Sequence, residues 1–269
     1  MKRREKLFLG VLVVFFAIGA SITHARSLDE IMKSGEIRVG INPTIVPLGL
    51  FNAKNEIDGF DKDFAEAVAE RLGVKLKVVQ VGSPDRIPYV ATDKVDFVMG
   101  AMTRTPERAK VIDFTLPVHT EVLGVLTTDK VAFDNYKEFN REDVTLVEVR
   151  GSTPVQFIQK NLPKAKLLLL DNQPDCIRSI AQGRAHAIID VIDFIWKHTK
   201  GYKNVNWKVV KTPITVYYCC LGVSKGNYSL RYWLNTVIYE LHREGFIDTI
   251  WEKWFEGPMI NKVQWTEWF

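Results

Sequence analysis

An arginine that stands among hydroxyl groups is the part of this sequence best suited to binding an anion. Arg108 follows Thr105-Pro106, a pair typical of helix starts, because threonine caps free N–H groups and proline fits the first helical position. Arg108 would then lie in a first helical turn, where the helix dipole already supplies positive charge. With Thr103 nearby, an anion, and most readily a carboxylate, would complete the site. The alternative is a surface arginine that pairs with a neighbouring carboxylate.

The same chemistry recurs further along the chain. Gly151-Ser152-Thr153-Pro154 combines a glycine turn, two hydroxyl groups, a threonine cap and a proline at the first helical position. If this helix start faces the one at Thr105, a small anion can be clamped between the two. An acid, Asp190, ends the predicted strand 187–190; helix capping is one explanation for it and for Asp193.

Alternating strands and helices are expected to position these groups. Strands are predicted at 36–41, 76–81 and 96–99, with helices between them, which favours a mostly parallel sheet covered on both faces. After Thr115-Leu116-Pro117 the chain should cross into a second lobe, and it should return at 212–216. The predicted lobe 1 comprises residues 26–118 plus 218–269 and lobe 2 residues 119–217, in an α/β fold with two lobes and two crossovers.

The N-terminal residues differ from the rest of the 269-residue chain. A basic start precedes a 16-residue apolar run, and Thr23-His24-Ala25 offers small residues for cleavage, so residues 1–25 are predicted to be a signal peptide. The alternative is an uncleaved membrane anchor, but a helix that spans a membrane usually needs a longer apolar run, of about 20 residues. The formal net charge is +4, of which four Lys/Arg and one Glu in this segment supply +3, leaving +1. A near-neutral protein without a basic patch is not expected to bind nucleic acid.

Cysteine and histidine give no metal signature. The three cysteines, Cys176, Cys219 and Cys220, include an adjacent pair, and an odd number is no disulfide framework. We expect small buried side chains rather than a bridge. The five histidines are scattered and no zinc spacing is present. Neither a metal site nor a cofactor is predicted.

The stretch around Arg108 resembles a known family. The pattern G-x-M-T-x-T-P-E-R-A-x-x-x-D-F-T, from Gly100 to Thr115, is similar to that of the periplasmic amino-acid-binding proteins of ABC importers, solute-binding protein family 3. Gly59 to Asp63 and Glu252 to Phe255 match further segments, so the resemblance extends from about Leu28 to Phe255. It implies a type II periplasmic binding protein fold, a periplasmic location, a monomer, and an ABC permease in the inner membrane as partner.

The resemblance also implies a ligand site between the lobes, for a small carboxylate or zwitterion such as an amino acid. Arg108 would grip the carboxylate and the other predicted contacts are Asn42, Ile45, Ala101, Thr103, Ser152 and Thr153. In the family an aspartate after the strand at 187–190 binds the ligand's ammonium group. A gap-free count places that aspartate at Val191, so either a local bulge brings Asp190 to the site or the ammonium contact has changed.

The family also contains cyclohexadienyl dehydratases, which makes an enzyme the rival prediction. The dehydratases carry a catalytic glutamate at the position where this chain has Phe194, and Asp193 is adjacent to that position. This mismatch favours a protein that binds a solute without catalysing a reaction. His119 and Glu121, near the first crossing, are spare acid–base candidates that hinge packing explains equally well. Arg86, at another helix start, is expected at the surface rather than in the cleft. The aromatic C-terminal tail, 256–269, either packs on lobe 1 or stays free.

Overall fold

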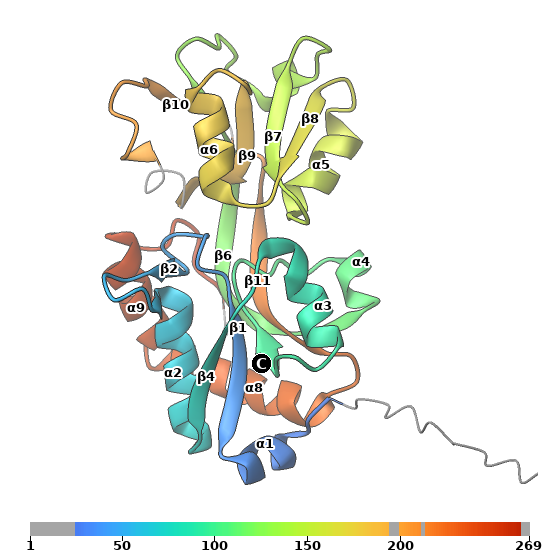
Figure 1. Cartoon of the computed structure of the whole chain (residues 1–269), viewed down its shortest axis with the longest axis vertical. Coiled ribbons are helices and arrows are strands. Elements are labelled where there is room, and N and C mark those ends of the chain that lie inside the picture. Colours follow the sequence, from blue (N-terminus) through green and yellow to red (C-terminus); the bar gives the residue numbers. More distant parts are fainter. Residues whose placement is uncertain (1–24, 194–198, 211–212, 265–269) are drawn as a thin grey trace, which may run out of the picture.

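The protein consists of two lobes joined by two long strands. A computed structural model describes residues 25–193, 199–210 and 213–264. The long strands are β6 (Ile112–Thr128) and β11 (Thr215–Ser224), which run side by side from one lobe into the other (Figure 1). None of the helices in the described part of the chain has the length and apolar character needed to cross a membrane.

The first lobe contains both ends of the described chain. In chain order its elements are α1 (Leu28–Ser34), β1 (Glu36–Ile41), β2 (Leu50–Phe51), β3 (Ile57–Asp58), α2 (Phe60–Leu72), β4 (Lys75–Gln80), a 3₁₀ turn η1 (Ser83–Asp85), α3 (Arg86–Ala91), β5 (Phe97–Val98), α4 (Pro106–Ala109), α8 (Tyr228–Arg243) and α9 (Phe246–Phe255). Apolar residues from β1, α2, α8 and α9 form its main core, in which Phe60, Phe64 and Trp251 are fully covered.

The second lobe is built from the segment between the two long strands. Its elements are η2 (Tyr136–Phe139), β7 (Thr145–Val149), α5 (Thr153–Asn161), β8 (Lys166–Leu170), α6 (Gln173–Ala181), β9 (Ala187–Val191) and β10 (Trp207–Val209). Two apolar clusters stabilise it, one around Phe139, Leu146 and Ile158 and one around Cys176, Ile177 and Ile188. Helices α5 and α6 flank β7 to β9 in the upper half of Figure 1.

One mixed sheet passes through both lobes. Its strand order is β4-β1-β5-β11-β6-β9-β7-β8, and β10 pairs with β6. The outer strands pair in parallel within each lobe, β1 with β4 and β5, and β7 with β8 and β9, whereas β6 and β11 pair antiparallel. The predicted α/β class with two lobes and two crossovers is confirmed. The chain was expected to cross into the second lobe after Thr115-Leu116-Pro117. It crosses as one continuous strand, β6, whose antiparallel pairing with β11 extends on both sides of Pro117 with register shifts near Cys220.

The two predicted helix starts differ in detail. Thr105 caps α4 as expected, since its hydroxyl accepts a hydrogen bond from the N–H of Arg108 at 3.2 Å. Helix α5 is capped one residue earlier than expected, at Ser152, so that Thr153 and Pro154 are its first two residues. Gly151 enters this turn with φ 77°, a left-handed conformation that glycine adopts without strain.

Two sequence predictions fall at the chain ends. The predicted signal peptide, except Ala25, lies outside the described residues, as do Trp265, Trp268 and Phe269 of the aromatic tail. The described part of the tail packs on lobe 1, where Met259 and Val263 are buried. The N–H of Thr120 in β6 donates to Met259 Sδ at 3.5 Å, so the tail lies against the strand that joins the lobes.

Candidate ligand-binding site between the lobes

A cavity lies where the two lobes meet, and it encloses about 580 Å³ of non-atom space. Both lobes supply its walls. The lining residues are Ile45, Ser83, Arg86, Ala101, Thr103, Glu121, Leu123, Glu148, Val149, Ser152, Thr153, Pro154, Gln173, Ile188, Asp190, Val191 and Tyr217. A few charged side chains and hydroxyl groups among apolar ones are typical of a site for a small polar ligand.

Most of the residues predicted for the site line this cavity, and two lie beside it. Those in the wall are Ile45, Ala101, Thr103, Ser152, Thr153 and Asp190. Arg108 lines an adjoining recess together with Gly151, Ser152 and Thr153. Asn42 is fully buried behind the wall, because its amide is committed to the loop: its Oδ1 accepts from the N–H and hydroxyl of Thr44, and its Nδ2 donates to Ser83 Oγ at 3.0 Å.

Arg108 joins the two helix starts. Its Nη1 donates to the carbonyl oxygen of Thr103 at 2.8 Å, and its Nη2 donates to the carbonyl oxygen of Gly151 in the second lobe at 2.9 Å. The side chain is 9% exposed, and burial lowers the pKa of its guanidinium. It is therefore not the surface arginine of the alternative interpretation. Because α4 spans only four residues, the hydrogen bonds of the guanidinium, rather than a helix dipole, define this end of the site.

The start of α5 presents free polar groups to the cavity. Ser152 is the N-cap residue, yet its hydroxyl does not cap the helix, and its buried Oγ has no hydrogen-bond partner among the described residues. The N–H groups of a first helical turn also have no partner within their helix. Buried unpaired hydroxyls are uncommon, and one in a cavity wall beside a guanidinium is positioned to donate to an anion.

Arg86 lies in the cavity wall and not at the surface, which corrects the sequence prediction. Its side chain is buried and donates to the carbonyl oxygens of Ser83 at 3.1 Å and of Gly100 at closer range. Burial and the neighbouring Arg108 lower its pKa to about 10. The sequence put Arg86 after a turn, but it gave no sign that the loop at Gly100 would fold back over that turn and need a cation to bind its carbonyl groups.

Carboxyl groups line the opposite wall, in the second lobe. Gln173 donates a short hydrogen bond to Asp190, whose other oxygen accepts from the N–H of Val191 at 2.7 Å. Burial raises the pKa of Asp190 to about 7. Strand β9 pairs with β6 in regular register from Ala187 to Val191, so Asp190 reaches the cavity without the bulge that the sequence comparison called for.

Two further buried acids line the cavity: Glu148 was not identified from the sequence, and Glu121 was raised only as an acid–base candidate for the enzyme prediction. Glu148 lies in β7 and accepts a hydrogen bond from the N–H of Ile189 at 2.8 Å, and burial raises its pKa well above the usual value. Glu121 in β6 accepts from Thr103 Oγ1 at 3.2 Å, and burial again raises its pKa. The available signal was an acid inside an otherwise apolar strand, as in Val147-Glu148-Val149, because such an acid is rarely buried without a role.

The residues raised for the enzyme prediction do not converge on the cavity. Asp193 is not part of its wall, and Phe194 lies outside the described residues. His119 is buried against Phe60 and Trp251, with ring centroids 5.6 and 5.5 Å apart. Glu121 is the one candidate of this group that lines the cavity.

The sequence as a whole matches a known family. Residues 37–257 correspond to the bacterial extracellular solute-binding proteins, family 3. The chain belongs to this family. It is 26% identical over 250 residues to the glutamate/aspartate import solute-binding protein of Escherichia coli (strain K12), covering 88% of this chain and 82% of that protein. The solute-binding family thus accounts for both lobes and both crossing strands.

Two further similar proteins help to distinguish a solute-binding protein from an enzyme. A crystal structure of an ancestral amino acid-binding protein, a precursor of cyclohexadienyl dehydratase, superposes with a TM-score of 0.78 at 33% identity, covering 85% of this chain and 99% of that one. Cyclohexadienyl dehydratase of Pseudomonas aeruginosa is 28% identical over 160 residues, 59% of this chain and 60% of that protein. The structural neighbours are type II periplasmic binding proteins, and the relatives are mainly binding proteins of importers, so this family member is a solute-binding protein rather than an enzyme.

Proposed function

We propose that this solute-binding protein captures a small zwitterion, an amino acid or a close analogue, in the cavity between its lobes. The observation that carries the proposal is the pairing of Arg108 with the start of α5. The guanidinium of Arg108 bonds to the carbonyl oxygen of Gly151, next to the unpaired hydroxyl of Ser152. A carboxylate that enters here would accept hydrogen bonds from a planar guanidinium, a hydroxyl and backbone N–H groups.

The ligand's ammonium group would contact Asp190. This carboxyl lies in the second-lobe wall, and its partner Gln173 fixes its orientation. A cation beside Asp190 would offset the cost of ionising a buried acid, because opposite charges favour each other's ionised forms. With Ile45 and Leu123 as apolar neighbours and Tyr217 as the aromatic residue of the wall, the cavity suits a small or aliphatic polar ligand.

The lobes would close over the ligand by a hinge and deliver it to a membrane permease. In this proposal the hinge lies where β6 and β11 pass between lobe 1, residues 26–118 plus 218–269, and lobe 2, residues 119–217. Hinge closure around ligands is the usual behaviour of periplasmic binding proteins. The protein would act as a monomer in the periplasm.

Export would require cleavage of a signal peptide after Ala25. The next residue, Arg26, is bound to the folded lobe: its Nε donates to Asp96 at 3.0 Å and its Nη1 to Ser34 Oγ at 2.9 Å. A mature chain that begins at Arg26 would keep these bonds, and N-terminal mass spectrometry of the exported protein tests the assignment.

Calorimetric titration tests the proposed ligand class. The purified protein is unfolded and refolded to remove retained ligand, then titrated with amino acids, the matching keto acids and the matching amines. A ligand that bears both a carboxylate and an ammonium group should bind and raise the melting temperature by mass action. If an amine without a carboxylate binds as tightly as its amino acid, the assignment of Arg108 and Ser152 is wrong.

A further inference from the structure

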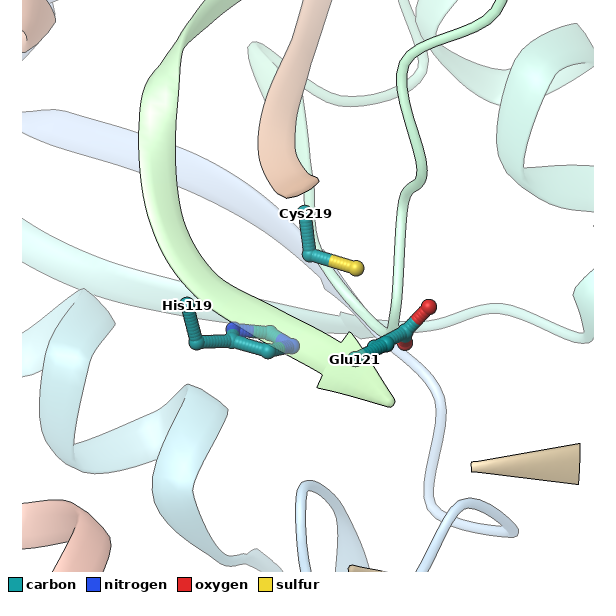
Figure 2. Close-up of side chains that lie close together, drawn as sticks. All are labelled: His119, Glu121 and Cys219. Carbon is teal, nitrogen blue, oxygen red and sulfur yellow. The ribbon is translucent and has the colours of Figure 1, made fainter. Parts of the chain in front are cut away.

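Three side chains capable of binding a metal ion converge beside the crossing strands. His119 and Glu121 lie two residues apart on β6 and so project from the same face, and Cys219 of β11 is paired directly with His119. One nitrogen, one oxygen and one sulfur atom from the three lie within 4.8 Å of one another. Figure 2 shows the thiol of Cys219 above the other two side chains, with the imidazole of His119 to the left of the Glu121 carboxylate.

Only part of the hydrogen-bonding capacity of this cluster is used by the fold: Glu121 accepts from Thr103 at 3.2 Å and bonds to the thiol of Cys219. Neither ring nitrogen of His119 has a hydrogen-bond partner in the described part of the chain, and the same holds for Glu121 Oε1. All three side chains are buried, with exposures of 3% for His119, 3% for Glu121 and 1% for Cys219. Buried polar atoms are nearly always paired, so an unpaired imidazole beside an unpaired carboxylate oxygen indicates an additional occupant, an ion or a water molecule.

A small cavity adjoins the cluster. The non-atom space there, open solvent included, is about 190 Å³, and Asp61, His119 and Cys219 are among the lining residues. Asp61 is fully buried, and neither of its carboxylate oxygens forms a hydrogen bond to another described residue. Asp61 lies outside the group of donor atoms that are within 4.8 Å of one another, so the fourth ligand would be a water molecule in this cavity or the Asp61 carboxylate after a side-chain movement.

We propose that His119, Glu121 and Cys219 bind a zinc ion, with the fourth position directed toward the small cavity. One thiolate, one imidazole and one carboxylate form a set of donors that Zn²⁺ accepts in tetrahedral geometry. Ligand distances of about 2.0–2.3 Å separate tetrahedral donors by roughly 3.3–3.8 Å. The donors here lie within 4.8 Å, so the side chains would move together by about 1 Å on binding.

Aromatic packing orients the imidazole of the proposed site. Phe60 and Trp251 pack on the ring of His119 and fix its orientation. The thiol of Cys219 loses its proton when the metal binds, as every thiolate ligand must.

The ion can approach from the ligand cavity. Glu121 and Thr103 line that cavity, and Glu121 accepts a hydrogen bond from Thr103 at 3.2 Å. The two sites therefore share one carboxylate, although the metal site does not depend on which solute the protein binds. Because Cys219 lies far along the chain from His119 and Glu121, the sequence contains no recognisable metal motif, and no metal site was predicted.

Cadmium and zinc titrations of the purified, chelator-treated protein test the site. Cadmium should produce a thiolate-to-metal charge-transfer absorption in the ultraviolet that saturates at one equivalent, and zinc should displace it. Cys219→Ser should abolish this absorption. Loss of an indirect, outer partner of a metal commonly costs 10–100-fold in affinity, so His119→Gln, which removes a direct ligand, should weaken zinc binding by at least about that factor.

Control variants distinguish metal binding by this cluster from metal binding by other cysteines and histidines. Cys220 is the adjacent buried cysteine, and its Sγ lies 4.0 Å from the carbonyl oxygen of Tyr218. His186 lies in the second lobe, where its Nδ1 accepts from the N–H of Thr145. Cys220→Ser and His186→Gln should leave both titrations unchanged. The double variant Cys176→Ser/Cys220→Ser keeps Cys219 as its one cysteine, and its absorption should persist even if Cys219→Ser does not fold.

Two results would overturn the proposal. The first is a wild-type protein that gives no thiolate absorption at one equivalent of cadmium, which would make a buried water molecule the occupant. The second is an absorption that disappears in the double variant, which would assign the metal to another thiol. Neither result affects the solute titrations, so a failed metal site and a failed solute site are distinguishable.

Discussion

The guanidinium group of Arg108 connects the two lobes directly, because its Nη2 donates a hydrogen bond to the carbonyl oxygen of Gly151 at 2.9 Å. Its Nη1 holds the carbonyl oxygen of Thr103 in its own lobe at 2.8 Å. A guanidinium has five N–H groups in a planar fork, so these two bonds leave further donors. Arg108 can thus hold the lobes together and still offer in-plane N–H donors to a carboxylate.

Replacing Arg108 tests this double role. Arg108→Lys keeps the charge but removes the planar fork, and it should weaken binding of a zwitterionic ligand about tenfold or more, since one charge-assisted hydrogen bond is worth about 1.5–3 kcal/mol. Arg108→Ala should weaken binding about 100-fold or more, because it removes both the charge and the fork. Isothermal titration calorimetry gives both values.

Arg150 supplies the matched control for Arg108. It stands next to Gly151, but it is exposed and pairs with Asp171 at 3.3 Å on the surface. Exposed ion pairs contribute little, so Arg150→Lys and Arg150→Ala should leave affinity unchanged. An Arg108→Ala protein that binds its ligand with wild-type affinity would move the carboxylate site elsewhere in the cavity.

Ser152 permits a test in which ligand binding should weaken while the stability of the ligand-free protein stays unchanged. Its buried Oγ has no partner among the described residues, so Ser152→Ala should not lower the melting temperature of the ligand-free protein. The same variant should weaken carboxylate binding about tenfold, because a hydrogen bond to a charged group is lost. Ser229→Ala, at an exposed position on α8, is the control. A fall in the melting temperature without a loss of affinity would assign Ser152 to helix capping alone.

The sequence identified most of the side chains that line the site between the lobes, but it did not predict in detail where each of them lies. Helix-start signals predicted the start of α4 and two sites that could clamp an anion if they faced each other, and the family resemblance implied the two lobes. Helix starts depend on local chemistry, which short windows of sequence contain. The continuous course of β6 through Pro117 was not predictable in this way, since it depends on pairing with β11 about 100 residues later.

Burial of charged side chains was the other feature that local sequence could not give. Arg86 was expected at the surface because arginine is rarely buried, yet the loop at Gly100 folds over it and supplies carbonyl acceptors. Asp190 reaches the cavity although the count along the family pattern placed the acid at Val191. In both cases long-range packing decided where the side chain points.

Arg86 should act mainly on stability. Its hydrogen bonds to Ser83 and Gly100 stay within the first lobe, in contrast to the bridging bonds of Arg108. Arg86→Met removes the cation and leaves buried carbonyl groups unpaired, at a cost of about 1–3 kcal/mol for each group. Thermal unfolding should therefore show a lower melting temperature, whereas Arg108→Ala should lower it less. If Arg86→Met unfolds at the wild-type temperature, water replaces the lost donors and the loop does not need this arginine.

Asp190 should make ligand affinity depend on pH. Burial raises its pKa to about 7, so in the ligand-free protein a growing fraction ionises as the pH rises from 6 to 8. Only the ionised form attracts an ammonium group, and the ionised fraction grows roughly tenfold over this range. Affinity for a zwitterionic ligand should therefore rise roughly tenfold from pH 6 to pH 8, and calorimetry at constant ionic strength measures the change.

The stability of the ligand-free protein should change with pH in the opposite direction. The folded-state pKa of Asp190 exceeds the ordinary aspartate value of 3.8, so the native protein retains a proton that the unfolded chain releases. The stabilisation from this group is complete below about pH 4 and is lost as the pH rises toward 7. Asp190→Asn should flatten both profiles, in binding and in melting temperature, while Asp171→Asn, at an exposed site, should change neither. An affinity profile that keeps its slope in Asp190→Asn would transfer the ammonium contact to Glu148 or Glu121, the other carboxyl groups of the cavity wall.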